Sequence, residues 1–192
     1  MKLRSKPKGN YAFIDNQNLN LGVQKLGWKM DWRKFRKFLK DEYNVEHAYM
    51  FIGHMPEHED MYLQLHDAGY LIVLKPTFDM SRPQPVQTKS APQDSSKEER
   101  PEDKKPVKGN VDAELVLWAV KEMKNYQKAV IVSGDGDFYS LVEYLETQNK
   151  LLHLLAPNGH YSSLYNKYDA YIQRVDRHKK QLAYKTFKRK VA

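Results

Sequence analysis

The chain contains no cysteine among its 192 residues. This absence excludes disulfide bonds, thiolate zinc sites and cysteine nucleophiles. The sequence also has no apolar run that approaches the roughly 20 residues of a membrane-spanning helix. The basic N-terminal stretch MKLRSKPKGN is not followed by the apolar segment of a secretory signal. We therefore expect a soluble protein that is located in the cytoplasm.

Acidic residues are outnumbered, with 24 Asp and Glu against 32 Lys and Arg, which gives a net charge of +8. Hydrophobic residues make up 41% of the chain, which is enough for a core, while the mean hydropathy of −0.79 indicates a heavily charged exterior. A basic balance favours polyanionic partners, of which nucleic acid is the first candidate.

Short apolar segments alternate with amphipathic ones along most of the chain. The apolar segments, which predict buried strands, are YAFIDN (11–16), VEHAYMFIG (45–53), YLIVLKP (70–76), KAVIVSG (128–134) and KLLHLLAP (150–157). The segments with helical spacing of apolar residues are 31–43, 57–69, 112–123, 137–149 and 161–172. This alternation predicts an α/β fold, in which a parallel sheet is covered by helices on both faces.

Two segments differ in composition from this pattern. Residues 79–108 contain five prolines, seven Lys or Arg and six Asp or Glu, so we expect an exposed insertion within one domain that spans 10–173. Residues 174–192 carry eight Lys or Arg and one acid, and we expect a basic C-terminal tail, matched by a basic arm at residues 1–9. Either segment is a candidate for contact with RNA, and the alternative is a solvated charge run.

Acidic side chains follow the predicted strands at the points where those strands end. Asp15 ends the first strand, Asp135 and Asp137 follow the fourth, and Asp112 opens a helix. Because ligands of parallel sheets bind beyond the carboxyl ends of the strands, we expect these carboxylates to meet there, with Asn18 beside them. Clustered carboxylates repel one another, and a hard cation such as Mg²⁺ or Mn²⁺ resolves that repulsion. The pattern favours metal-dependent hydrolysis of phosphodiesters.

Each of these residues also has a structural interpretation. Asp15 is a candidate cap or turn residue, while Asp112 and Asp137 are candidate helix N-caps. The pair around Gly136 does not continue into the further ligands of a calcium-binding loop. A small-nucleotide phosphohydrolase is a third interpretation, but the chain lacks a Walker-type phosphate loop. The residues following Asp15 also lack the D-x-D-x-[TV] pattern of haloacid-dehalogenase phosphatases.

Three ordered blocks of sequence carry a family resemblance. FIDNQNL (13–19), KGNVDAELVLWAV (108–120) and VIVSGDGDFYSLV (130–142) resemble the signature blocks of NYN domains, which belong to the PIN-like nuclease superfamily. The resemblance is to the LabA-like branch, and APNGHYSSLYNKYDAYI (156–172) resembles the block that closes this domain. The insertion before Asp112 departs from the family pattern.

The resemblance implies a Rossmann-like three-layer α/β/α sandwich with a mostly parallel central sheet. It also implies an endoribonuclease with a Mg²⁺ or Mn²⁺ cofactor and an RNA substrate, either single-stranded or structured. The alternative is a catalytically inactive NYN-fold module that binds RNA or acts as a scaffold, and a homo-oligomer is left open. By position, the metal ligands are Asp15, Asp112, Asp135 and Asp137, with the first and third as direct ligands, and Asn18 as the polar partner. The implied substrate-binding residues are Ser133, Lys108 and Asn16.

Two further patterns have competing explanations. His54 and His58 are spaced i,i+4, but Pro56 lies between them, so a zinc site is disfavoured and a place beside the cleft is the alternative. Tyr161, Leu164, Tyr165 and Tyr168 have helical spacing, which favours a packed face over a surface on which bases stack.

Overall fold

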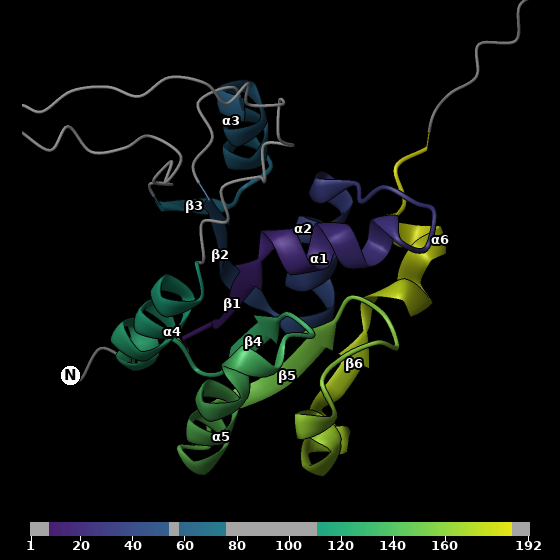
Figure 1. Ribbon diagram of the computed structural model, residues 1–192. Coiled ribbons are helices and arrows are strands. Elements are labelled where there is room, and N and C mark those ends of the chain that lie inside the picture. The colour runs from purple at the N-terminus through teal and green to yellow at the C-terminus, as the bar shows by residue number, and fades with distance from the viewer. Residues whose placement is uncertain (1–7, 54–57, 76–110, 186–192) are drawn as a thin grey trace, which may run out of the picture.

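A six-stranded sheet, in the order β3-β2-β1-β4-β5-β6, forms the centre of the protein (Figure 1). The computed structural model describes residues 8–53, 58–75 and 111–185. All strand pairings in this sheet are parallel, so the predicted α/β fold is confirmed. The strands are β1 (Asn10–Asp15), β2 (Val45–Gly53), β3 (Leu71–Lys75), β4 (Ala129–Val132), β5 (Leu151–Ala156) and β6 (Ile172–Arg174).

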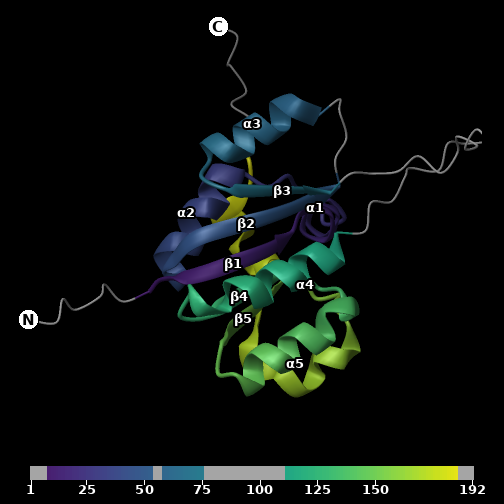
Figure 2. The same ribbon diagram turned by 90° about the vertical axis from the view of Figure 1, so that its left-hand side faces the viewer.

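Helices cover both faces of the sheet, and a separate hydrophobic core lies on each face. Alternate residues of β1 enter opposite cores, because successive side chains of a strand point to opposite faces: Ile14 enters one core and Phe13 the other. Figure 2 shows α4 and α5 on the side of the sheet that faces the viewer. The α-helices are α1 (Asn16–Gln24), α2 (Trp32–Tyr43), α3 (Glu59–Asp67), α4 (Asp112–Lys121), α5 (Tyr139–Thr147) and α6 (Lys179–Leu182). Short 3-10 helices are η2 (Glu122–Lys124), η3 (Gly136–Phe138), η4 (Ser163–Tyr171) and η5 (Val175–His178).

The ends of the predicted helices follow from local chemistry. Asp31 caps α2, since its side chain accepts a hydrogen bond from the backbone N of Lys34 at 3.2 Å. Gly69, which follows α3, has a φ of +92°, a backbone conformation that stops a helix and favours glycine. None of the described helices is long and apolar enough to cross a membrane.

Several elements differ from the expectations. The segment that follows β1 forms α1, which the sequence pattern did not indicate, and residues 163–171 form a 3-10 helix. The expected basic tail begins with structure that belongs to the domain, because β6 and α6 lie within residues 172–182 and Val175 and Leu182 are buried. The boundaries of the arm, the domain and the tail stay predictions, and the expected insertion lies outside the described residues.

Candidate functional site

Asp15 lies at the carboxyl end of β1, where the strand turns directly into α1. Its side chain is 5% exposed. One oxygen, Oδ1, accepts a hydrogen bond from the backbone N of Asn18 at 3.0 Å, so Asp15 caps α1. The other oxygen, Oδ2, accepts a hydrogen bond from the hydroxyl of Ser133 at 3.2 Å. Asp15 therefore has the structural role expected of a cap in addition to any chemical role.

Ser133 joins the end of β4 to the end of β1. The residue is fully buried, and its Oγ accepts a hydrogen bond from the backbone N of Asp135 at 3.1 Å while donating to Asp15. A second link runs from the backbone N of Gly134 to Oδ1 of Asn18 at 2.9 Å. These contacts fix the loop after β4 against the start of α1.

Asp135 and Asp137 differ in role and exposure. Asp135 is half-buried and caps η3, because its Oδ1 accepts a hydrogen bond from the backbone N of Asp137 at 3.1 Å. The expectation that Asp137 is the cap is therefore wrong. Asp137 itself is exposed at the surface of the site. The hydroxyl of Tyr165 donates a hydrogen bond to the backbone carbonyl of Asp135, which holds this turn from the opposite side.

Asp112 approaches the same edge of the sheet from α4. It is half-buried in the first turn of that helix, and the N-cap position belongs to Val111 rather than to Asp112. Burial raises the pKa of Asp15, and the charges of Asp112 and Asp135 raise it further, against the opposing hydrogen bonds from Asn18 and Ser133. Carboxylates from two other stretches of chain are thus near enough to Asp15 to disfavour its charge.

The side chains at this edge have the ligand atoms that a hard cation prefers, because they are carboxylate oxygens with the amide of Asn18 and the hydroxyl of Ser133 beside them. Among residues 8–53, 58–75 and 111–185, however, no three or more His, Asp or Glu side chains form a group that could hold a metal ion. The carboxylates are therefore electrostatically coupled without being gathered into a ready set of ligands. Glu114 of α4 forms an ion pair with Lys75, whose Nζ lies 3.0 Å from Oε2.

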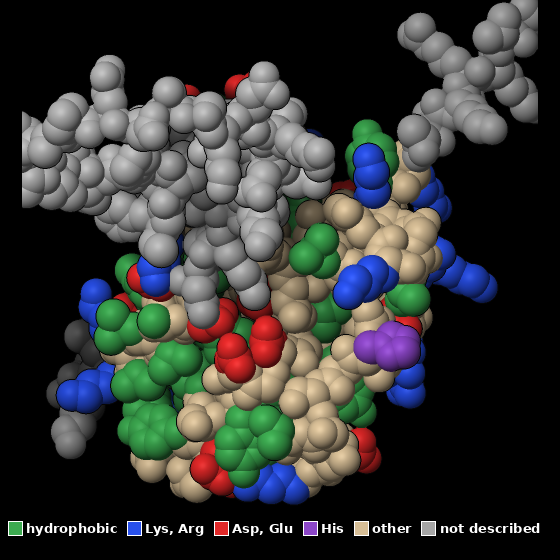
Figure 3. All heavy atoms as spheres, in the orientation of Figure 1, with side chains coloured by type: hydrophobic (Ala, Val, Ile, Leu, Met, Phe, Trp, Pro, Cys, Tyr) green, Lys and Arg blue, Asp and Glu red, His purple; other side chains and the backbone are tan. Residues whose placement is uncertain are grey.

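An open depression of about 810 Å³ lies over this edge. Residues 134–137 and Asn18 form one wall, and residues 159–162 with Leu164 form the other. Figure 3 shows Asp and Glu side chains gathered near the middle of this face, with Lys and Arg side chains towards its edges. This distribution is suited to a cation at the centre and a polyanion across the rim.

The two glycines of the acidic loop are required by close packing. Neither Gly134 nor Gly136 has a positive φ, so their backbone conformation does not itself require glycine. A Cβ on Gly134 would lie 3.2 Å from Cβ of Tyr161, and one on Gly136 would lie 2.6 Å from Oγ of Ser162. The absence of these side chains allows the two walls of the depression to touch.

The remaining expected site residues differ in burial, and some lie outside the described residues. Asn16 is half-buried as the first residue of α1, and Lys108 lies outside the described residues. His54 also lies outside them, while His58 is exposed immediately before α3. Tyr165 and Tyr168 are buried, as the packed-face interpretation predicts, although Leu164 of the same pattern is 54% exposed.

Sequence reasoning missed the loop at residues 157–162 as part of the site. Asn158, His160 and Ser162 follow β5, and two of these, His160 and Ser162, line the acidic depression. The available signal was positional: this loop follows the carboxyl end of a strand adjacent to β4, where the same rule that selected Asp135 applies.

The all-parallel sheet with carboxylates at its carboxyl edge defines an α/β protein whose candidate site lies beyond the ends of the strands. The family model described as "NYN domain" matches residues 11–176, so the chain belongs to the NYN domain family. Low amplitude and bright protein LabA of Synechococcus elongatus is 25% identical over 174 residues, which are 89% of this chain and 86% of that protein. A crystal structure of a Vibrio parahaemolyticus protein of unknown function shares the fold, with a TM-score of 0.65 and 21% identity over 95% of this chain and 100% of that one.

Proposed function

We propose that this NYN domain protein is a metal-dependent endoribonuclease that hydrolyses RNA phosphodiester bonds. The observation that carries the proposal is the electrostatic coupling of Asp15 with Asp112 and Asp135 at the carboxyl edge of the sheet. A buried carboxylate with other carboxylates near it is unfavourable for folding, and such an arrangement is typical of functional sites. The family to which the chain belongs, of the PIN-like superfamily, supports a nuclease over other metal-dependent hydrolases.

Asp15 and Asp135 would hold Mg²⁺ or Mn²⁺, with Asp112 as a further ligand or one water molecule away, while Asp137, which is more exposed, would act through a water molecule. A divalent cation bound there lowers the pKa of a water molecule and offsets negative charge on a phosphodiester. Ser133 is fully buried, so its role is to orient Asp15 and the backbone of Asp135 rather than to touch substrate. Asn18 holds Gly134 in the same way. Hydrolysis would leave a 5′-phosphate and a 3′-hydroxyl.

RNA is the proposed substrate because the chain combines an acidic centre with a net charge of +8. Lysines and arginines towards the edges of the face in Figure 3 would neutralise phosphates of a bound strand and make binding sensitive to salt. The cytoplasmic location and any homo-oligomer stay predictions.

A specific observation favours a second candidate, an NYN-fold module that binds RNA or a partner protein without cutting. The described residues contain no ready group of three metal-binding side chains. A module of this kind would retain salt-sensitive binding of RNA in the presence of EDTA and would show no cleavage with Mn²⁺.

Cleavage of a mixed RNA substrate by the purified full chain distinguishes the two candidates. The wild type should cut in Mn²⁺ and stop in EDTA, whereas Asp135→Asn should be slower by about 100-fold or more, because even neighbours of metal ligands cost about 10- to 100-fold. Asp169→Asn, at an exposed position of η4, is the matched control and should cut like the wild type. Equal cleavage by the wild type and Asp135→Asn would show a contaminating nuclease and refute the proposal.

A further inference from the structure

A second, smaller pocket adjoins the acidic depression. Its volume is about 370 Å³, and it lies between α1, with the residues just after that helix, and the loop at 157–160. Asn18 and His160 line both this pocket and the acidic depression, so the two spaces lie side by side at these residues. The expected site residues do not explain this pocket, because Asn18 is the only one of them in its lining.

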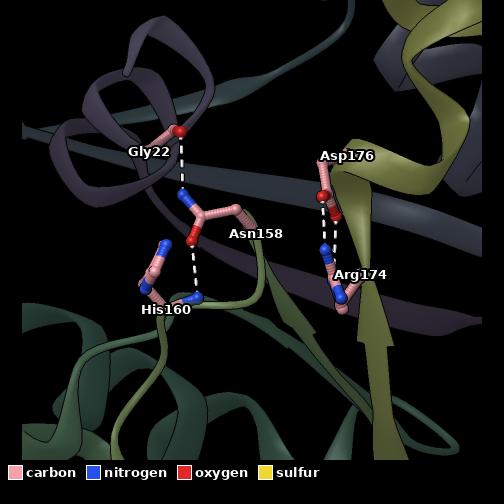
Figure 4. A network of polar contacts seen from close by, with 5 residues as sticks. All are labelled: Gly22, Asn158, His160, Arg174 and Asp176. Carbon is pink, nitrogen blue, oxygen red and sulfur yellow. Dashed lines mark hydrogen bonds and ion pairs between the residues drawn. The ribbon is translucent and has the colours of Figure 1, made fainter. Parts of the chain in front are cut away.

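The walls of this pocket are held at a fixed separation. Asn158, which is 6% exposed, donates from Nδ2 to the backbone carbonyl of Gly22 at 2.8 Å and accepts at Oδ1 from the backbone N of His160 at 2.7 Å (Figure 4). One buried amide thereby connects α1 to the loop. A Cβ on Gly22 would lie 2.4 Å from Cβ of Pro157, so glycine is needed for the helix to approach the loop this closely.

The loop is also supported from its far side. A Cβ on Gly159 would lie 3.2 Å from Cζ of Arg174, so the guanidinium packs directly against this glycine. Asp176 accepts two hydrogen bonds from Arg174, at 3.1 Å from Nε and 2.6 Å from Nη2, which fixes the guanidinium in place (Figure 4). The backbone that carries His160 is therefore positioned before any ligand binds.

The side chains of the pocket combine an apolar wall with a cation. Leu21 and Leu26 are 49% and 41% exposed, which leaves apolar surface open to a ligand. In the part of the chain that the structure describes, the ammonium of Lys25 and the ring of His160 have no polar partner. A ligand that combines a flat ring with a phosphate suits these side chains. The ring would stack on the imidazole and the leucines, and the phosphate would bind the lysine.

We propose that this pocket binds one nucleotide of the RNA, next to the phosphodiester that is cut. The base lies between the two leucines and the ring of His160, and its phosphate contacts Lys25. The inference rests on the proposed function for its ligand class, because the pocket adjoins the acidic depression at Asn18 and His160. It assigns His160 and Lys25 to substrate binding.

The test is a titration of the ¹⁵N-labelled full chain with uridine 5′-monophosphate and adenosine 5′-monophosphate in EDTA, followed by amide chemical shifts. We expect the shifts to concentrate at Gly22, Lys25, Leu26, Gly159 and His160. Lys25→Gln and the double variant Leu21→Ser with Leu26→Ser should each weaken binding by about tenfold. Leu117→Ser, which removes a leucine that is 62% exposed on α4, is the matched control and should bind like the wild type.

The result that would overturn the proposal is the absence of shifts at the pocket for both nucleotides, or equal affinity in the wild type and both pocket variants. Because EDTA removes the cation, this titration does not depend on cleavage. Localised shifts in a protein that never cuts RNA would support the pocket and refute the proposed function. Cleavage of RNA without shifts at the pocket would support the proposed function and refute the pocket.

Discussion

The hydroxyl of Ser133 donates a hydrogen bond to Oδ2 of Asp15 across 118 residues of sequence. The same hydroxyl accepts a hydrogen bond from the backbone N of Asp135. One buried oxygen thus sets the relative positions of two acidic residues that arrive on neighbouring strands, β1 and β4. The site depends on this serine for its geometry, although its side chain never reaches the surface.

Replacement of Ser133 tests this relationship. Ser133→Ala should lower the free energy of unfolding by about 1–3 kcal/mol, because it leaves the backbone N of Asp135 and one oxygen of Asp15 without their buried partner. It should also raise the pKa of Asp15 further, since the Ser133 hydrogen bond lowers it. Urea unfolding at neutral pH measures the first effect. Ser140→Ala, on the exposed face of α5, is the control, and equal stability of the two variants would contradict the prediction.

The dependence of stability on pH should reveal the cost of ionised Asp15. The pKa of this carboxyl in the folded protein is raised above its ordinary value of 3.8. The folded state therefore binds this proton more tightly than the unfolded state does. Protonation of Asp15 stabilises the folded protein fully below pH 3.8, and this stabilisation is lost as pH rises through the folded pKa. Above that pKa the charge opposes folding.

Asp15→Asn keeps one oxygen to cap α1 but replaces the oxygen that accepts from Ser133 with an NH2 group, so it should gain stability relative to the wild type as pH rises from 4 to 8. This gain should shrink as pH falls and the wild-type carboxyl takes up its proton. Thermal unfolding in EDTA from pH 4 to pH 8 measures it. Asp15→Ala removes the cap as well as the charge, and it should lack about 1 kcal/mol of the gain. A gain for Asp15→Asn that does not change with pH would contradict the account.

The contact between the two walls of the depression gives a third prediction. Gly136→Ala should destabilise the protein by about 1–3 kcal/mol, because its Cβ would lie 2.6 Å from Oγ and 3.1 Å from Cβ of Ser162. Ser162→Gly should relieve part of this loss when the two are combined. Chemical unfolding of the single and double variants measures the coupling. Strictly additive losses would show that the walls do not meet at these residues.

Much of the fold was predictable because the strands are strongly apolar. The segment Val45–Gly53 was expected as a strand and forms β2 with the same bounds, and Asp31 was expected as a cap and is one. The helix α1 was not expected, because its sequence NQNLNLGVQ is rich in Asn and contains Gly22, residues of low helix propensity. Its stability comes from the Asp15 cap and from burial of Leu19 and Val23.

The place of Asp15 and Asp135 beyond the strands was predictable, the second wall of the depression was not, and the role of these carboxylates in binding a metal stays a prediction. Position after a strand was sufficient to select Asp15 and Asp135, because parallel strands share one carboxyl edge. The pairing of Gly136 with Ser162, and of Gly22 with Pro157, depends on how distant segments pack, which no local pattern encodes. The sequence also did not show that Asp135 rather than Asp137 is the cap. Both residues have a carboxylate that can accept a backbone hydrogen bond, and the backbone geometry of the turn selects Asp135.

The central claim is that carboxylates at this edge of the sheet share a divalent cation. The most direct measurement is an anomalous difference map from crystals of the protein soaked in Mn²⁺. The account predicts a Mn²⁺ peak bounded by carboxylate oxygens of Asp15 and Asp135, with Asp112 as a further ligand or one water molecule away. A map with no peak between these side chains, from crystals in which they are ordered, would contradict it.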